Sequence, residues 1–226
     1  MRAARLHAWD ITLAEAAAVQ RDMAVRVSQV NGLTRAPRYI AGVDISGAWR
    51  GEEATGAVVV LTYPGLLVAE VRTVRIAPPF PYVPGFLSFR EIPVLLPAFE
   101  RLSITPDLLL VDGHGLAHPR RFGIACHLGV LLDVPAIGCG KSLLVGEHDP
   151  VPLRRGSWRP VAHRGEVVGA ALRTKDGVKP VYVSVGHKID LKSAVRWTLA
   201  CATRYRLPDP TRLAHEAASG RLAPED

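Results

Sequence analysis

The first half of the chain shows a helical pattern followed by three strand-like runs. Thr12 and Glu15 form a capping-box sequence, in which each side chain can bond the other residue's backbone N–H, and apolar residues at helical spacing follow. We therefore expect a helix from Thr12 to about residue 31. The next apolar runs, separated by turn residues, predict an antiparallel meander of strands at 39–46, 57–63 and 66–76.

A short run that is apolar at every position, 108–111, lies near the middle of the chain. Such a run predicts a strand buried on both faces, as found inside an α/β sheet. Asp112 follows it directly, at the end of the strand where ligands and catalytic groups gather in sheets of this kind. Asp-Gly is also a common turn pair, so from its position alone Asp112 either starts a turn or serves a site.

The remaining pattern alternates helices and strands. Ser88 and Glu91 form a second possible capping box, which gives Glu91 a structural reason for its position. Asp190 is placed to cap a later helix. The expected elements are helices at 88–102, 119–133 and 190–202, a short helix holding His215, strands at 134–138, 166–172 and 180–185, and an exposed excursion at 147–165.

Composition indicates a basic protein with a substantial core. The chain has 226 residues, 48% of them hydrophobic, and a net charge of +7. This length fits one domain, 1–226, and the charge suits an anionic partner such as nucleic acid. Only 5 of the 28 basic residues are lysine, and this excess of arginine can reflect a GC-rich genome as well as phosphate binding.

Cysteine usage and hydropathy bear on the compartment. The 3 cysteines form no CxxC pair, and we expect them to be reduced core thiols. We see neither a signal-peptide pattern nor an apolar stretch long enough to cross a membrane. We therefore expect a soluble, cytoplasmic protein without a membrane partner. We also expect a monomer.

A proline-rich loop at 78–90 holds several aromatic residues. Because prolines stiffen a loop, Tyr82 between Pro81 and Pro84 would be presented in a fixed direction, where it could stack on or wedge between bases. The alternative is an ordinary hydrophobic loop packed on the domain.

Lys141 lies in a glycine-containing loop after an expected strand. The sequence around it resembles the end of a phosphate-binding P-loop, but Pro135 stands where that motif requires glycine, which excludes it. Lys141 either reaches a phosphate or is a solvated surface lysine.

Three carboxylates stand out from the pattern: Asp44 within an apolar strand, Glu91 and Asp112. Their wide separation in sequence means that only the fold could bring them together. Hard oxygen ligands of this type suit Mg²⁺ or Mn²⁺, and in a basic protein they point to metal-assisted phosphodiester cleavage.

Three segments resemble the motifs of the endonuclease V family, the deoxyinosine-specific repair nucleases. They are PYVPGFLSFRE at 81–91, VDGHGLAHPRRFGIACHLG at 111–129 and YRLPDPTR at 205–212, and the similarity extends from about residue 39 to residue 215. The resemblance implies an α/β, ribonuclease-H-like fold with a mixed central β-sheet flanked by helices. One departure concerns residues 45–49, where the aromatic residue often found just after the first carboxylate motif is missing.

The resemblance also implies roles for individual residues. The expected metal ligands are Asp44, Glu91 and Asp112, with Lys141 and His118 near the active-site phosphate and His215 near the metal. The expected strand wedge is Pro81, Tyr82, Val83 and Pro84. The expected base pocket, working through backbone groups and close packing, is formed by Gly85, Leu87, Gly113, Gly123 and Ile124, with Tyr82 beside it.

The activity implied is Mg²⁺-dependent nicking of DNA at the second phosphodiester bond 3′ of deoxyinosine, with Mn²⁺ able to substitute, leaving a 3′-hydroxyl and a 5′-phosphate. One alternative is a ribonuclease-H-like nuclease that acts on inosine-containing RNA or on branched DNA. Another is a non-catalytic nucleic-acid-binding protein, in which the carboxylates only cap helices and form turns.

Overall fold

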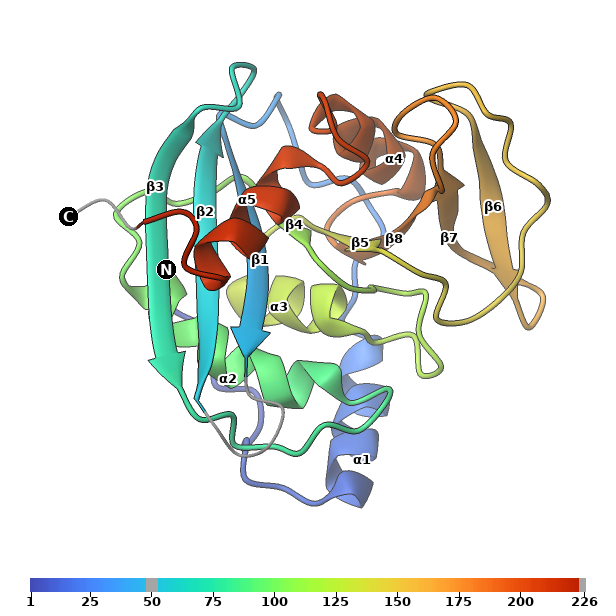
Figure 1. Cartoon of the computed structure of the whole chain (residues 1–226). Coiled ribbons are helices and arrows are strands. Elements are labelled where there is room, and N and C mark those ends of the chain that lie inside the picture. Colours follow the sequence, from blue (N-terminus) through green and yellow to red (C-terminus); the bar gives the residue numbers. More distant parts are fainter. Residues whose placement is uncertain (48–52, 224–226) are drawn as a thin grey trace.

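A computed structural model describes residues 1–47 and 53–223. Residues 48 and 49 of the segment 45–49, and most of the glycine-rich gap after it, lie outside these ranges. The described chain forms one eight-stranded sheet (Figure 1). Its strands are β1 (Tyr39–Gly47), β2 (Ala54–Thr62), β3 (Val68–Ile76), β4 (Leu108–Val111), β5 (Ala136–Gly140), β6 (Trp158–His163), β7 (Glu166–Leu172) and β8 (Val181–His187).

The strand order is β3-β2-β1-β4-β5-β8-β7-β6. β1, β2 and β3 form the antiparallel meander that the apolar runs and turn residues predicted. β4 pairs parallel to both β1 and β5, and all four of its residues are buried, as expected for a strand inside the sheet. The mixed sheet confirms the α/β, ribonuclease-H-like fold expected from the sequence.

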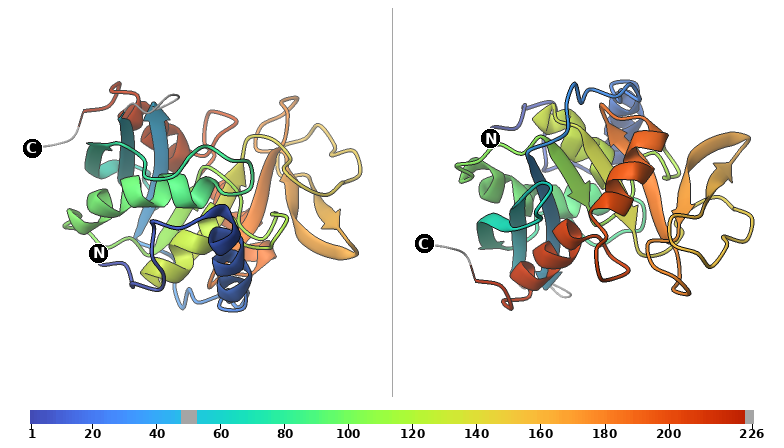
Figure 2. Two further views of the ribbon diagram at one scale, coloured as in Figure 1. Left: turned by 90° about the horizontal axis from the view of Figure 1, so that it is seen from below. Right: turned by 90° about the horizontal axis from the view of Figure 1, so that it is seen from above.

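Helices cover both faces of this sheet (Figure 2). One face carries α1 (Leu13–Ala24), α2 (Leu87–Glu100) and α3 (Ile124–Leu132), and the other carries α4 (Leu191–Ala200) and α5 (Asp209–Ala218). The main core lies between the sheet and these helices, and includes Ile40, Leu95, Phe99, Leu109, Leu128 and Ile137. Within the described residues, no helix is long and apolar enough to cross a membrane.

The helix expected from Thr12 to residue 31 is shorter than predicted. Its capping box is present, with the Thr12 amide donating to Glu15 at 2.8 Å, but the helix ends at Ala24. The apolar periodicity beyond that point continues through Val27 and Val30, but only Val27 is partly buried against the core and Val30 is exposed. β-branched residues in that stretch also favour the helix less than the alanines before them.

Two other helix starts differ from the sequence prediction. α2 begins at Leu87 after Phe86, without a side-chain cap, so the capping box expected from Ser88 and Glu91 is wrong. The expected helix start at residue 119 is also wrong, because Arg121 has a left-handed backbone with a φ of 55°, and α3 begins only at Ile124.

The expected excursion at 147–165 contains an unpredicted edge strand, β6, which pairs antiparallel with β7. Pro160 lies within β6. Proline has no N–H to donate to a ladder, and it is tolerated in an edge strand because one side of that strand has no neighbour to bond. The proline- and arginine-rich composition concealed the strand. The three cysteines are buried and free, as expected.

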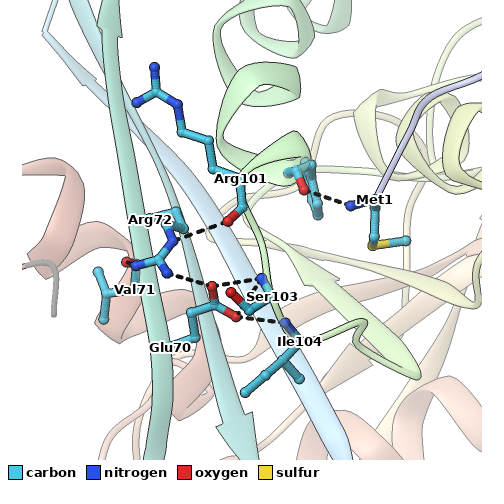
Figure 3. A network of polar contacts seen from close by, with 8 residues as sticks. Met1, Glu70, Val71, Arg72, Arg101, Ser103 and Ile104 are labelled. Atoms are coloured by element: carbon cyan, nitrogen blue, oxygen red, sulfur yellow. Dashed lines mark hydrogen bonds and ion pairs between the residues drawn. The ribbon is translucent and has the colours of Figure 1, made fainter. Parts of the chain in front are cut away.

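A buried carboxylate connects β3 to the chain that follows α2. Glu70 accepts hydrogen bonds from the amides of Ser103 at 2.9 Å and Ile104 at 2.8 Å, and pairs with Arg72 at 3.0 Å (Figure 3). Arg72 in turn donates to the carbonyl of Arg101 at 3.2 Å. This network fixes the end of α2, and with it the path of the chain into β4.

We expect Glu70→Ala to lower the free energy of unfolding by about 2 kcal/mol, because it removes a buried carboxylate and leaves two partly buried amides and a guanidinium without their acceptor. Urea denaturation measures this change. The control is Glu53→Ala, which removes an exposed ion pair to Arg75 and should change stability little. Equal effects of the two substitutions would contradict this account of Glu70.

Candidate active site

The parallel pairing of β1, β4 and β5 brings three charged side chains to one edge of the sheet. Val43 pairs with Val111, so that Asp44 and Asp112, the next residue of each strand, lie side by side. Lys141 follows β5 immediately, and its ammonium group contacts the Asp112 carboxylate. These are the carboxyl ends of neighbouring parallel strands, where α/β sheets place their sites.

His215 reaches this edge from α5, on the other side of a close contact between helix and sheet. A Cβ atom at Gly42 would lie 1.9 Å from the carbonyl oxygen of Pro210, so only glycine lets α5 pack this closely on β1. The packing brings His215 Nδ1 to 2.7 Å from the Asp44 carboxylate. The last helix of the described chain thus contributes directly to the cluster around Asp44.

Glu91 joins the cluster from α2. Because it does not cap the helix, its carboxyl is free to turn toward the strand ends. Burial, together with the negative charges of Asp44 and Asp112, raises the pKa of Glu91 to about 8. The carboxyl therefore tends to hold a proton at neutral pH in the absence of a cation.

The other two charged groups of the cluster are also perturbed. Burial and the neighbouring Asp44 raise the pKa of Asp112, and Lys141 only partly opposes this change. Burial tends to lower the pKa of Lys141, but its contact with Asp112 outweighs this and the pKa is raised. Lys141 is therefore cationic at neutral pH and compensates part of the negative charge.

The donor set fits a hard divalent cation by its chemistry. The three carboxylates of Asp44, Glu91 and Asp112 are close enough for their mutual repulsion to raise pKa values, and a cation would relieve that repulsion. Among the described residues, however, no group of three His, Cys, Asp or Glu side chains is arranged as a metal centre. Lys141 and His215 each contact one of the carboxylates instead.

A cavity of about 270 Å³ opens beside these charged groups. A Cβ atom at Gly113 would lie 2.6 Å from Ile124 Cγ2, so a larger residue at 113 would displace the cavity wall. Of the residues expected for the base pocket and the wedge, all line this cavity except Pro81. The lining members are Tyr82, Val83, Pro84, Gly85, Leu87, Gly113, Gly123 and Ile124.

One backbone carbonyl fixes the wall that carries Tyr82. The oxygen of Gly85 accepts hydrogen bonds from Gln20 Nε2 at 3.0 Å, His118 Nε2 at 3.0 Å and Arg120 Nη2 at 2.7 Å. Gly85 has a φ of 80°, a left-handed conformation that favours glycine. The loop is thus held by donors from α1 and from the segment before α3.

The structure places His118 in this wall of the cavity. Its Nε2 bonds to Gly85 and its Nδ1 accepts from the amide of Arg120 at 3.2 Å, so that both ring nitrogens are engaged. Burial and the positive charge of Arg120 lower the pKa of His118 to about 4, which leaves a neutral ring. The expected phosphate contact of His118 stays a prediction.

Cavity and carboxylates share two pieces of backbone. Asp112 belongs to the charged cluster and the next residue, Gly113, lines the cavity. Leu87 and Glu91 are four residues apart on α2 and therefore lie on one helix face, Leu87 at the cavity and Glu91 in the cluster. A second hollow of about 450 Å³ runs along this connection and is lined by Tyr82, Leu87 and Glu91.

Several residues of the cavity were not anticipated from the sequence. Gln20 belongs to α1, which was expected to be structural only, and no local pattern shows that it reaches a loop 65 residues away. His114 packs against Gly140, where a Cβ atom would lie 2.5 Å from its ring, and burial lowers its pKa. The lining residues that were not expected at the site are Gln20, Ser88, His114, Ser142, Leu143 and Leu144.

Comparison with known proteins identifies the family. The family model for endonuclease V matches residues 21–216. The chain belongs to the endonuclease V family. Endonuclease V of Roseiflexus castenholzii is 54% identical over 217 residues, covering 96% of each chain.

Solved structures of the family agree with the fold. The endonuclease V of Streptomyces avermitilis is 42% identical, with a TM-score of 0.88 over 94% of this chain and 93% of that one. The endonuclease V of Ciona intestinalis, solved in complex with DNA containing an inosine followed by a ribo-adenosine, is 26% identical. Its TM-score is 0.80, over 92% of this chain and 96% of that one.

The raised pKa of Glu91 predicts how stability depends on pH without divalent metal. Between its ordinary value of 4.5 and about 8, the unfolded chain loses a proton that the folded protein keeps. Stability should therefore fall as pH rises through this window, by about 1.4 kcal/mol per pH unit from this group. Glu91→Gln should remove that fall, as measured by urea denaturation in chelator from pH 5 to 8.

The control is Glu100→Gln, on the exposed side of the same helix, which should retain the pH dependence of the unsubstituted protein. Parallel stability curves for the unsubstituted protein and Glu91→Gln would show that Glu91 does not hold the proton.

Proposed function

We propose that this protein is an inosine-directed DNA repair endonuclease that cuts the second phosphodiester bond 3′ of deoxyinosine and leaves a 3′-hydroxyl and a 5′-phosphate. The main support is the direct connection between a base-sized cavity and a cluster of carboxylates through Asp112–Gly113 and one face of α2. A nucleotide whose base entered the cavity would present its own backbone to Asp44, Glu91 and Asp112. Membership of the endonuclease V family supports the same activity.

The cavity suits an extruded purine with an oxygen at position 6. α2 begins at the cavity without a side-chain cap, and the first amides of a helix have no partner within the helix. The amides of Leu87 and Ser88 are therefore candidate donors to that oxygen, where adenine instead carries an amino group. The Ciona complexes with inosine-containing DNA support this assignment.

Tyr82 is the proposed strand wedge. Its side chain is 62% exposed, in the proline-rich segment at the mouth of the cavity. An aromatic ring at this place can fill the space left by an extruded base and stack on its neighbours. The three donors to the Gly85 carbonyl hold the loop in position for this contact.

Asp44, Glu91 and Asp112 would hold a divalent cation, Mg²⁺ with Mn²⁺ as a substitute. Such a cation activates water for attack on a phosphate and stabilises the leaving oxygen. Lys141 supplies a permanent positive charge beside Asp112 for the charge that develops on the phosphate. His215 holds the Asp44 carboxylate in place through its hydrogen bond of 2.7 Å.

Two other functions remain as alternatives to be tested. A nuclease for inosine-containing RNA would use the same carboxylates and cavity, and one for branched DNA would need neither the cavity nor Tyr82. A protein that only binds nucleic acid would have no use for carboxylates with raised pKa values. Cytoplasmic location and a monomeric state also stay predictions.

A nicking assay with and without Mg²⁺ tests the proposal on three substrates: inosine-containing DNA, inosine-containing RNA and a four-way DNA junction. We expect Mg²⁺-dependent cleavage of the inosine DNA, with sequencing of the ends locating the cut. Preferential cutting of the RNA or the junction would favour the first alternative, and no cleavage of any substrate would favour a binding protein.

We expect Asp112→Asn to abolish nicking and to leave the affinity for inosine DNA nearly unchanged, because the substitution removes a cation ligand and not a wall of the cavity. Turnover and fluorescence anisotropy measure the two effects. Asp149→Asn, in an exposed loop, serves as the matched control. Normal turnover by Asp112→Asn in Mg²⁺ would refute the proposed role of this carboxylate.

Tyr82→Ala should weaken binding of inosine DNA by about 1–3 kcal/mol, the usual contribution of one aromatic ring stacked on a base. Tyr82→Phe keeps the ring and should retain most of the affinity. Leu67→Ala, at another exposed apolar side chain, controls for general surface effects. If Tyr82→Phe weakens binding as much as Tyr82→Ala, the hydroxyl rather than the stacked ring is responsible.

A further inference from the structure

A chain of hydrogen bonds runs from the N-terminal segment to the base cavity. His7 Nδ1 bonds to the carbonyl oxygen of Ala8 at 2.7 Å, and His7 Nε2 lies 2.7 Å from His127 Nε2. His127 Nδ1 lies 3.1 Å from the hydroxyl of Ser88, which lines the cavity. His127 and Ser88 are both buried.

The carbonyl oxygen of Ala8 fixes the donor and acceptor at every step of this series of hydrogen bonds. A carbonyl oxygen only accepts, so His7 Nδ1 carries a proton and, in a neutral ring, His7 Nε2 accepts. His127 must then donate from Nε2 and accept at Nδ1. The Ser88 hydroxyl therefore donates its proton to His127, and its oxygen lone pairs remain able to accept another hydrogen bond.

Both imidazoles are held in the neutral form that this direction requires. Burial lowers the pKa of His7, more strongly than its bond to Ala8 raises it. Burial lowers the pKa of His127 well below its ordinary value, and the neighbouring His7 adds to this effect.

The segment that carries His7 is attached to the helices of the same face. The Met1 nitrogen donates to the carbonyl of Phe99 at 2.9 Å, a bond also visible in Figure 3, and the Ala4 amide donates to Leu131 at 2.8 Å. Trp9 stacks on His127, with ring centroids 5.4 Å apart. These contacts keep His7 in line with His127.

We propose that Ser88 is a specificity-determining residue whose oxygen accepts the N1–H of hypoxanthine, and that His7 and His127 impose this acceptor role on it. The inference rests on the proposed function. Hypoxanthine presents an oxygen at position 6 beside N1–H, whereas adenine presents an amino group beside an unprotonated N1. Helix amides that donate, beside a serine oxygen that accepts, match the first edge and oppose the second.

The position of Ser88 on α2 supports this pairing. Ser88 is the second residue of the helix, so its hydroxyl lies next to the first-turn amides proposed to bind the oxygen at position 6. The hydroxyl does not cap the helix, and its proton is directed to His127 instead. Donor and acceptor therefore come from one helical turn.

Ser88→Ala tests the acceptor. Dissociation constants are measured without divalent metal for DNA containing inosine, adenosine or unsubstituted purine, which lacks both N1–H and the oxygen. We expect inosine binding to weaken about five- to tenfold, the effect of one hydrogen bond, and purine binding to stay unchanged. Equal weakening of both, or no weakening for inosine, would overturn the proposal.

His7→Phe tests the relay without altering the cavity. Phenylalanine keeps a ring in place but removes the acceptor for His127 Nε2–H, so the proton should move to Nδ1, and His127 should then donate to Ser88. Nitrogen NMR shifts of His127 report this change of tautomer, and the preference for inosine over adenosine should fall about five- to tenfold. An unchanged tautomer or an unchanged preference would refute the relay.

His148→Phe is the matched control. The ring of His148 also bonds through Nδ1 to the carbonyl of the next residue, at 2.8 Å, but it lies on an exposed loop and belongs to neither cavity nor cluster.

Failure of the proposed function itself would give a different result, since the unsubstituted protein would then bind inosine DNA and adenosine DNA equally.

Discussion

The site depends above all on the parallel pairing of β4 with β1 on one side and β5 on the other. Parallel register sets Asp44 and Asp112 level with each other, and β5 brings Lys141 to the same edge. Burial, together with the nearby charges of Asp44 and Asp112, raises the pKa of Glu91. The sheet therefore holds these groups in fixed positions, and the repulsion among the three carboxylates favours binding of a cation.

Close backbone approaches are the second requirement. Gly42 admits the first turn of α5 against β1, which carries His215 to Asp44. Gly113 leaves room for the cavity next to Asp112. Gly42 lies two residues before Asp44, and Gly113 directly follows Asp112. The missing side chains of these glycines are therefore what gives α5 and the cavity room beside the two carboxylates.

Local patterns were sufficient for most of the sheet. The meander and the buried strand at 108–111 both follow from apolar runs bounded by turn or polar residues, because such runs report burial directly. Helix ends were less predictable. Val27 and Val30 continue the helical period although α1 ends at Ala24, and Ser88 has the sequence of a cap while its hydroxyl bonds His127. Tertiary contacts decided these cases.

The family resemblance pointed to the three carboxylates and to the glycines of the cavity as site residues, and the structure brings each of these two sets together. It gave no indication of Gln20, because a glutamine within a helix has no local signature of a bond to a loop far along the chain. The same holds for His7 and His127, which are 120 residues apart in sequence and meet only through the fold.

The packing of α5 on β1 also bears on how the protein is made. Four charged groups of the cluster precede β6 in the sequence: Asp44, Glu91, Asp112 and Lys141. His215 lies on α5, the last helix of the described chain, which covers β1 and β2. A ribosome delivers the chain from its N-terminus, so the sheet and four of the five charged groups emerge before their last partner. The sheet and most of the charged groups can therefore fold first, and the cluster is completed only when α5 packs on β1 and brings His215 to Asp44.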